Sequence, residues 1–228
     1  MSTTEKIKQT PIHDVHNPEL LALMRTDYSG VVEVGSSSGA LARAYRQSNP
    51  NCSYVGIEID ADYSEASKAH CTEVLLGNVE HFSDAEFHRL CQAQCWVFGD
   101  ALEHLYDPWK VLARIKTHSA PSTEVVACIP NAQYWGIQSV LNNGHFFYQD
   151  SGLLDRTHIR WFTRNTMIHM FLAAGFQVVA MAPRTGRQPT EAMAEGLQQI
   201  ARASGADPAQ ALQDSVAFQY VMRAVTPP

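Results

Sequence analysis

Short apolar segments alternate with longer stretches of helical character along most of this 228-residue chain. A helical stretch between two strands is long enough to cross a sheet and to start the next strand parallel to the last. The pattern therefore predicts one α/β domain, with a mostly parallel seven-stranded sheet and helices on both faces. The strands are expected at residues 31–34, 54–59, 73–76, 95–98, 124–129, 176–181 and 216–225.

The same pattern indicates how the chain is divided. A helix start at residues 17–19 places the beginning of the single domain there, and we expect that domain to span residues 17–228. Residues 1–16 are polar and are expected to be a flexible N-terminal segment. Residues 131–162 are irregular and are expected to form an insertion or lid beside the ligand. Residues 189–213 form a helical insert before the last strand, and a homodimer surface, a lid and plain packing all remain open for it.

Charge and composition exclude several classes of protein. The net charge is −6 and no run of lysine or arginine occurs, so we expect no nucleic-acid partner. No apolar run approaches the roughly 18 residues of a membrane helix, and the first residues lack the apolar core of a signal peptide. We therefore expect a cytoplasmic protein without a membrane span. Its five cysteines are expected to be reduced, and Cys91 and Cys95 lack the further ligands that a zinc site needs.

A glycine-rich turn follows the first strand, with the pattern Glu33-x-Gly35-x-x-x-Gly39. Glycines permit the sharp turn and a close approach of a ligand to the backbone. A dinucleotide site favours G-x-G-x-x-G, whereas Ser37 stands here in the place of the middle glycine. The acid at Glu33 suits a cationic ligand group better than a pyrophosphate. The turn thus argues against a nicotinamide-dependent oxidoreductase.

Polar side chains also follow the next two strands. Glu58 lies at the end of the second strand, 19 residues after Gly39, where an acid can accept hydrogen bonds from both hydroxyls of a ribose. Asn78 and Val79 follow the third strand. There an amide can reach the amino group of an adenine while a valine packs on the ring, although asparagine is also common in plain turns.

The segment VFGDALEHLYDPW at residues 97–109 is the most specific motif. Together with VVEVGSSSGALA, YVGIEID, GNVE, IPN and GLLDRTHIRWFT, in that order over residues 31–163, it resembles the class I S-adenosylmethionine-dependent methyltransferases. The likeness is greatest to the branch with ubiquinone-biosynthesis O-methyltransferases and polysaccharide-pathway methyltransferases. It implies a Rossmann-like methyltransferase domain whose last strand is antiparallel.

The resemblance also implies a cofactor and its site. The cofactor is S-adenosylmethionine and the product S-adenosylhomocysteine. Glu33, Gly35, Ser37 and Gly39 would line the methionine part, Glu58 would bind the ribose, Ile59, Asn78 and Val79 would frame the adenine, and Asp100 would lie near the sulfonium. Many relatives have aspartate in place of Asn78, and the amide oxygen can serve in its stead.

The resemblance places the acceptor beside His104, and seven aromatic residues within 134–162 suit a pocket wall or lid for it as well as they suit packing. We expect a small-molecule or saccharide acceptor that is methylated on oxygen. His104 and His158 are the candidate general bases, because imidazole titrates near neutral pH, and Asp100 completes the catalytic set. Loop packing is the alternative role for His158.

Two further alternatives concern the same segment. The pattern Asp100-x-x-Glu103-His104 resembles a motif that holds a divalent cation in some ubiquinone-type and RNA-end methyltransferases. We expect no metal ligands and favour helix capping and packing for these residues. A non-catalytic protein that binds the cofactor would carry the same motifs. An RNA methyltransferase is disfavoured by the acidic charge.

Overall fold

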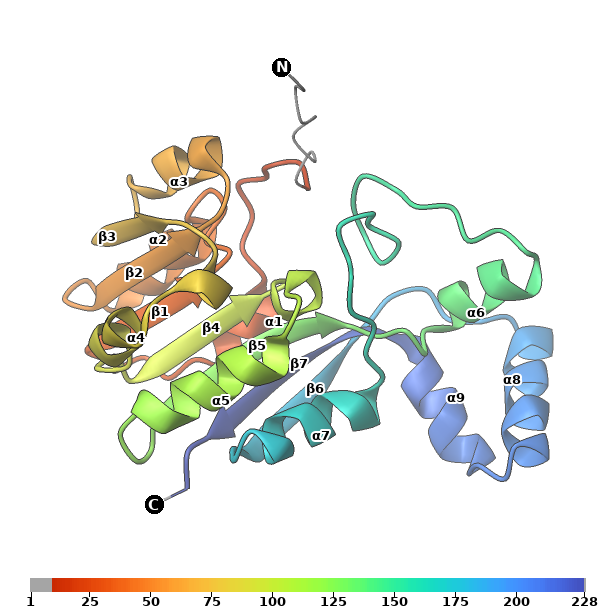
Figure 1. The fold of residues 1–228 in the computed structure, drawn as a ribbon. Helices are drawn as coiled ribbons and strands as arrows, with labels where there is room; N and C mark the ends of the chain where they lie inside the picture. Colours follow the sequence, from red (N-terminus) through yellow and green to blue (C-terminus); the bar gives the residue numbers. More distant parts are fainter. Residues whose placement is uncertain (1–9, 228) are drawn as a thin grey trace.

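A computed structural model describes residues 10–227 (Figure 1). Its seven-stranded sheet has the order β3-β2-β1-β4-β5-β7-β6. The strands are β1 (Gly30–Val34), β2 (Ser53–Glu58), β3 (Glu73–Leu76), β4 (Cys95–Gly99), β5 (Glu124–Pro130), β6 (Gln177–Thr185) and β7 (Ala217–Val225). The strands β1 to β5 pair in parallel, and β7 runs antiparallel to both β5 and β6. This arrangement confirms the predicted α/β class and its antiparallel last strand.

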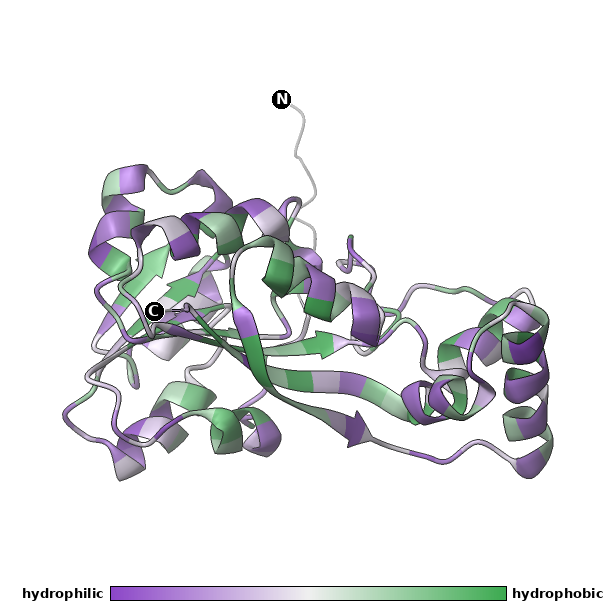
Figure 2. Ribbon diagram, turned by 90° about the horizontal axis from the view of Figure 1, so that it is seen from below, coloured by the Kyte–Doolittle hydropathy of each residue, from purple (hydrophilic) through white to green (hydrophobic). Residues whose placement is uncertain are grey.

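Helices cover both faces of the sheet. The helices are α1 (Pro18–Leu23), α2 (Ala40–Ser48), α3 (Ala61–Ser67), α4 (Asp84–Leu90), α5 (Pro108–His118), α6 (Trp135–Asn142), α7 (Arg164–Ala173), α8 (Glu191–Ala203) and α9 (Pro208–Val216), with the 3₁₀ turns η1 (Val79–His81) and η2 (Leu102–His104). Buried side chains of α1 and α2 pack on one face, and those of α4, α5 and α7 pack on the other. Figure 2 shows hydrophobic strands between helices that carry hydrophilic residues. No helix within residues 10–227 is long and apolar enough to cross a membrane.

Side chains with the expected capping roles begin several helices. The Asn17 side chain accepts a hydrogen bond from the backbone of Leu20 at 3.0 Å and caps α1. Thr163 caps α7 in the same way, and Gly175 follows that helix with a φ of 87°. Such caps satisfy backbone N–H groups that the first turn of a helix leaves free. The predicted start of α1 is therefore confirmed.

The region beyond β5 differs most from the expectation. The helix α6 was not predicted, and β6 continues to Thr185 because β7 offers it a partner along nearly its whole length. The helical insert contains two helices, since Asp207 caps α9 and Pro208 occupies its first turn. We call α6, α8 and α9 the helical lobe. Figures 1 and 2 both show it standing away from the rest of the domain, at one end of the sheet.

Candidate functional site

The glycine turn after β1 has the left-handed backbone that its residues suggest. Gly35, Ser37 and Gly39 have φ values of 78°, 46° and 76°. Left-handed backbone is common for glycine and unusual for serine. The amide of Gly35 donates to the carbonyl of Ile57 at 2.8 Å, so the turn is joined to the end of β2. Backbone groups of β1 and β2 thus meet at one edge of the sheet.

The Glu33 carboxyl group is buried beside this turn. The hydroxyl of Tyr54 donates to it at 3.0 Å. Burial raises the pKa of Glu33 to about 8, because the charged form loses water; the Tyr54 hydrogen bond opposes this shift and the nearby Glu58 adds to it. At neutral pH the carboxyl group is therefore mostly protonated, and a cationic ligand group beside it would favour its ionised form.

Glu58 ties the turn to the end of β2. Its side chain is buried and accepts hydrogen bonds from the backbone amides of Ser37 at 2.9 Å, Ile59 at 2.8 Å and Asp60 at 3.0 Å. An ionised carboxylate has about four acceptor positions, so it can hold these amides and still accept from a ligand hydroxyl. The expected ribose contact of Glu58 remains a prediction, and its loop-fixing role is an additional one.

The candidate adenine residues lie beside Glu58. Ile59 directly follows β2 and is 56% exposed, so its side chain is free to pack on a ligand ring. The Asn78 side chain accepts from the amide of Glu80 at 2.9 Å and caps η1. Val79 is turned into the main core and is 2% exposed. Asn78 thus has a structural role already, and the adenine contacts of Asn78 and Val79 remain predictions.

Asp100 ends β4 with a positive φ of 56°, and its amide donates to the carbonyl of Cys128. Its carboxylate accepts from the amide of Gln219, which in turn accepts from Arg184. Gln219 and Arg184 face each other across the β6–β7 pair, and sequence reasoning missed both. Desolvation raises the pKa of Asp100 to about 6, and the charge of Arg184 and the hydrogen bond from Gln219 oppose the shift.

His104 of η2 and His158 of the loop after α6 lie side by side, although the two segments are distant in the sequence. Their rings lie 4.8 Å apart between centroids, in an edge-to-face arrangement. Nδ1 of His104 is 3.1 Å from the carbonyl of Thr157, and Nδ1 of His158 is 3.1 Å from the carbonyl of Leu153. A carbonyl only accepts, so each Nδ1 carries the proton and each Nε2 of a neutral ring has a free lone pair.

Glu103 lies against this pair. Its side chain is 1% exposed, and neither carboxylate oxygen has a hydrogen-bond partner among the described residues. One of these oxygens is 3.9 Å from Nε2 of His158. Burial raises the pKa of Glu103, lowers the pKa of His104 to about 4 and lowers the pKa of His158. Asp100 is not part of this group of three side chains. The residue that caps α5 is Asp107, so Asp100, Glu103 and His104 do not cap that helix.

The aromatic residues of the irregular region serve more than one role. Phe146 contacts Trp161 at 5.4 Å between ring centroids, and Trp161 lies 6.3 Å from His158. Phe162 is buried in the core, whereas Phe147 is 72% exposed. Some of the cluster therefore packs the domain, whereas Trp161 borders the histidine pair and Phe146 packs against Trp161.

Residues 10–16, which we call the N-terminal strap, run over the same edge. The Tyr63 hydroxyl donates to the carbonyl of Thr10 at 2.8 Å, and the Thr10 hydroxyl donates to Asp155 at 2.7 Å. Asp14 pairs with Arg43 of α2. The strap thus joins α2 and α3 to the loop that carries His158. Residues 1–9 of the expected N-terminal segment lie outside the described residues.

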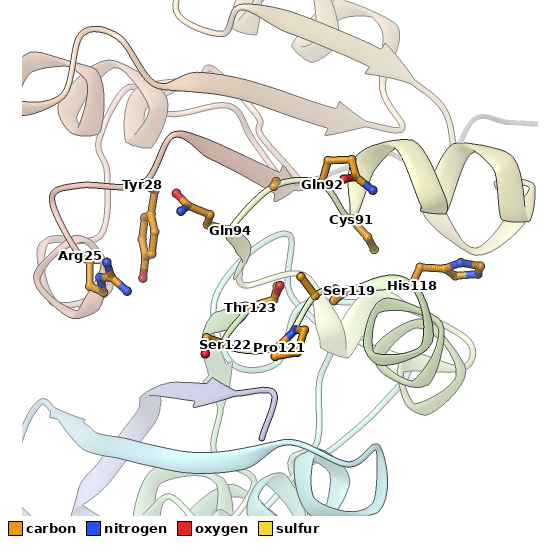
Figure 3. A pocket seen from close by; sticks show the side chains of 12 residues that line it. Arg25, Tyr28, Cys91, Gln92, Gln94, His118, Ser119, Pro121, Ser122 and Thr123 are labelled. Carbon is orange, nitrogen blue, oxygen red and sulfur yellow. The ribbon is translucent and has the colours of Figure 1, made fainter. Parts of the chain in front are cut away.

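A pocket of about 460 Å³ opens at the opposite edge, near the amino ends of the strands (Figure 3). Tyr28, Gln94 and Thr123 are among its lining residues. The Tyr28 hydroxyl donates to buried Glu124 at 2.6 Å. None of the predicted site residues lines this pocket, and ligands of parallel α/β sheets bind at the carboxyl ends of the strands. The candidate site is therefore the edge with the glycine turn.

The strand order, the glycine turn and the acids that end β2 and β4 define a class of protein, the class I S-adenosylmethionine-dependent methyltransferases. The chain belongs to the family described as "Methyltransferase domain", whose model matches residues 15–181. No curated protein was found with significant sequence similarity to it.

Solved structures agree with this fold. A chain in the complex of the Haloferax volcanii Trm112 methyltransferase activator has a TM-score of 0.61 and 14% identity, over 92% of this chain and 88% of that one. A candidate methyltransferase from Bacillus halodurans C-125 has a TM-score of 0.59 and 14% identity, over 92% of this chain and 98% of that one. The magnesium protoporphyrin IX methyltransferase from Synechocystis PCC 6803, with bound S-adenosylhomocysteine, has a TM-score of 0.56 and 10% identity, over 92% of this chain and 79% of that one.

Proposed function

We propose that this methyltransferase transfers the methyl group of S-adenosylmethionine to an oxygen of a small-molecule or saccharide acceptor. The observation that carries the proposal is the pair of half-buried His104 and buried His158, which lies at the same sheet edge as the glycine turn and Asp100. A cofactor held at that turn would present its sulfonium between the turn and the histidines.

The residues of the turn would bind the two ends of the cofactor. Glu33 would favour the ammonium of the methionine part, and Gly35 leaves the backbone open to it because it has no side chain. Glu58 would accept from the ribose hydroxyls while it holds the turn in place. Ile59 would cover one face of the adenine, since its side chain is otherwise left in water.

The transfer itself needs alignment and removal of one proton. The acceptor oxygen attacks the methyl carbon in line, the carbon–sulfur bond breaks, and S-adenosylhomocysteine leaves with the bonding electrons. The hydroxyl proton goes to Nε2 of His104 or His158, because each Nδ1 is held by a carbonyl. Alignment of acceptor and cofactor supplies much of the rate, because the sulfonium already activates the methyl group.

The motif around His104 supports a place near the ubiquinone-type and polysaccharide-pathway methyltransferases. Trp161 beside the histidine pair, with Phe146 packed against it, suits an acceptor with an apolar face. The five cysteines are free and buried, which is consistent with a cytoplasmic enzyme.

Calorimetric titration of the purified protein with S-adenosylhomocysteine and S-adenosylmethionine tests the cofactor site. We expect micromolar binding, about −8 kcal/mol, and no binding of NADH as the control. A folded protein that binds neither sulfur compound would contradict the proposal. Binding of NADH instead would support an oxidoreductase.

An acceptor screen that detects S-adenosylhomocysteine release tests the chemistry. His104→Ala and His158→Ala should keep cofactor binding, and at least one of them should lose about 100-fold or more in turnover. If both variants keep full turnover, neither histidine is the base. If no oxygen nucleophile is turned over although the cofactor binds, the non-catalytic alternative gains support.

A further inference from the structure

We propose that the N-terminal strap, residues 10–16, is a gate over the cofactor edge and that Asp155 is its latch. S-adenosylmethionine would enter and S-adenosylhomocysteine would leave only when the strap lifts, and the strap would close again by binding the loop on the acceptor side. The inference rests on the proposed cofactor site at the glycine turn, and it does not depend on which atom of the acceptor is methylated.

The strap contacts the glycine turn itself. Ser38 lies inside the turn, between Gly35 and Gly39, and its hydroxyl donates to the carbonyl of His13 at 2.9 Å. His13 also lies near the end of β4: desolvation raises the pKa of Asp100, and the charge of His13 is among the influences that oppose this rise. The strap therefore reaches both the end of β1 and the end of β4, where the cofactor is expected.

Polar contacts hold the strap at two further points. Asp14 pairs with Arg43 of α2, with 2.7 Å between the charged atoms. At Thr10 the strap accepts from the hydroxyl of Tyr63 at 2.8 Å and donates to Asp155 at 2.7 Å. Figure 1 draws the strap in red, leading from the described start of the chain to α1. The strap thus bridges the helices beside the glycine turn and the loop after α6.

The strap has little else to keep it closed. None of residues 10–16 is buried, and the apolar side chains Ile12 and Val15 are 45% and 69% exposed. Among residues 10–227, no backbone carbonyl accepts a hydrogen bond from an amide of the strap. A segment without buried apolar side chains or backbone hydrogen bonds opens at a low cost in free energy. The few polar contacts therefore decide whether the strap is closed.

Asp155 has the environment that a latch requires. It is 2% exposed; one carboxylate oxygen accepts from Thr10, and the other accepts from the amide and the hydroxyl of Thr157 at 2.8 and 2.6 Å. Burial acts to raise the pKa of Asp155, but these hydrogen bonds outweigh it and lower the pKa below its usual range, so the carboxylate is ionised at neutral pH. A hydrogen bond to an ionised group is stronger than one between neutral groups. Water screens the partly exposed pair of Asp14 and Arg43, so closure depends chiefly on the bond from Thr10 to Asp155.

The latch also reaches the acceptor side of the site. The carbonyl of Asp155 accepts from the amide of His158 at 3.0 Å, and its carboxylate holds Thr157. When the strap is open, one oxygen of the buried carboxylate loses its donor, which costs free energy. Closure of the strap and order in the loop after α6 therefore favour each other.

The test measures the rate at which S-adenosylhomocysteine dissociates from the full chain and from variants at Thr10, by stopped-flow displacement. Thr10→Val removes the hydroxyl and nearly keeps the volume of the side chain. Dissociation should become about tenfold faster, the effect of losing one hydrogen bond to a charged group. Thr10→Ser keeps the hydroxyl and should release the ligand at the wild-type rate.

Thr117→Val is the matched control. The hydroxyl of Thr117 donates to the carbonyl of Ala113 at 2.9 Å within α5, so this variant also loses one threonine hydrogen bond but leaves the strap unchanged. It should release S-adenosylhomocysteine as the wild type does. Charge reversal tests the second contact: Asp14→Lys and Arg43→Glu should each speed dissociation about two- to fivefold, and the double variant should return to the wild-type rate.

Hydrogen exchange measures closure of the strap directly. The amides of residues 12–16 should exchange more slowly when S-adenosylhomocysteine is bound, and Thr10→Val should lose most of this protection. Equal dissociation rates for wild type and Thr10→Val, or strap amides whose exchange the ligand leaves unchanged, would overturn the gate and leave the proposed function intact. Folded protein that does not bind S-adenosylhomocysteine in equilibrium calorimetry would refute the proposed cofactor site and the gate together.

Discussion

Binding of S-adenosylhomocysteine should release a proton from Glu33. The free protein holds this carboxyl group with a pKa of about 8, so it is mostly neutral at pH 7. An ammonium group placed beside it would stabilise the charged form and lower that pKa. Affinity should therefore increase with pH up to about 8 and then level off, because below that value binding must also displace the proton.

The size of the effect follows from the shift. With a pKa of about 8 for Glu33, about 0.9 of the molecules are protonated at pH 7, so full ionisation on binding would release about 0.9 proton per site. Between pH 6 and pH 7 the affinity should rise about tenfold, which is about 1.4 kcal/mol.

The same group affects folding. Its pKa in the folded protein lies above the unfolded value of 4.5, so the folded state holds the proton more tightly than the unfolded state. Stability is then highest below pH 4.5 as far as Glu33 is concerned, and it is lost as the pH rises through about 8.

Calorimetry at pH 7 in two buffers with different ionisation enthalpies measures the released proton directly. Glu33→Gln has no proton to release, so the difference between the two buffers should fall to the background that the ligand's own amino group contributes. Tyr54→Phe removes the hydrogen bond that favours the charged form and should move the wild-type profile to higher pH. Equal enthalpies in both buffers for wild-type protein that binds the ligand would refute the reasoning.

Two further substitutions test the turn. Glu58→Ala should abolish measurable binding of S-adenosylhomocysteine. It should also cost about 1–3 kcal/mol of folding stability, because three backbone amides lose their acceptor. A variant that binds the ligand normally in calorimetry would remove Glu58 from the cofactor site. Gly39→Ala should lower the free energy of unfolding by about 1–3 kcal/mol, since φ is 76° and the added Cβ would lie 3.2 Å from the Ser67 backbone. Unchanged stability in chemical denaturation would show that the turn tolerates a side chain.

The sheet and its ligand edge could be predicted because their signals are local. The apolar runs, the spacing of Gly35 and Gly39, and the caps Asn17 and Thr163 are all read within a few residues. Parallel strands then bring their carboxyl ends to one edge without further information. The likeness at the DALEH segment added which ligand this edge would take.

The features that were missed depend on contacts between distant segments. Gln219 reaches Asp100 across 119 positions, because β7 lies beside β5. Nothing near Glu103 in the sequence shows that its carboxylate would be left without a partner beside His158. The helix α6 was missed because aromatic residues at its start, such as Trp135, suited an irregular lid equally well.

The pairing of β6 with β7 does not depend on the helices α8 and α9 that connect these two strands. The register pairs Thr185 at the end of β6 with Ala217 at the start of β7, so the chain that forms α8 and α9 leaves the sheet and returns to it at facing positions. A short hairpin turn could join these two residues without changing any other strand pair. The segment that forms α8 and α9 is therefore separable from the sheet: a shorter connection at this point would leave the strands that hold the cofactor edge in register. One buried residue of the lobe, Asp214, fastens it to the sheet through the hydroxyl of Tyr220.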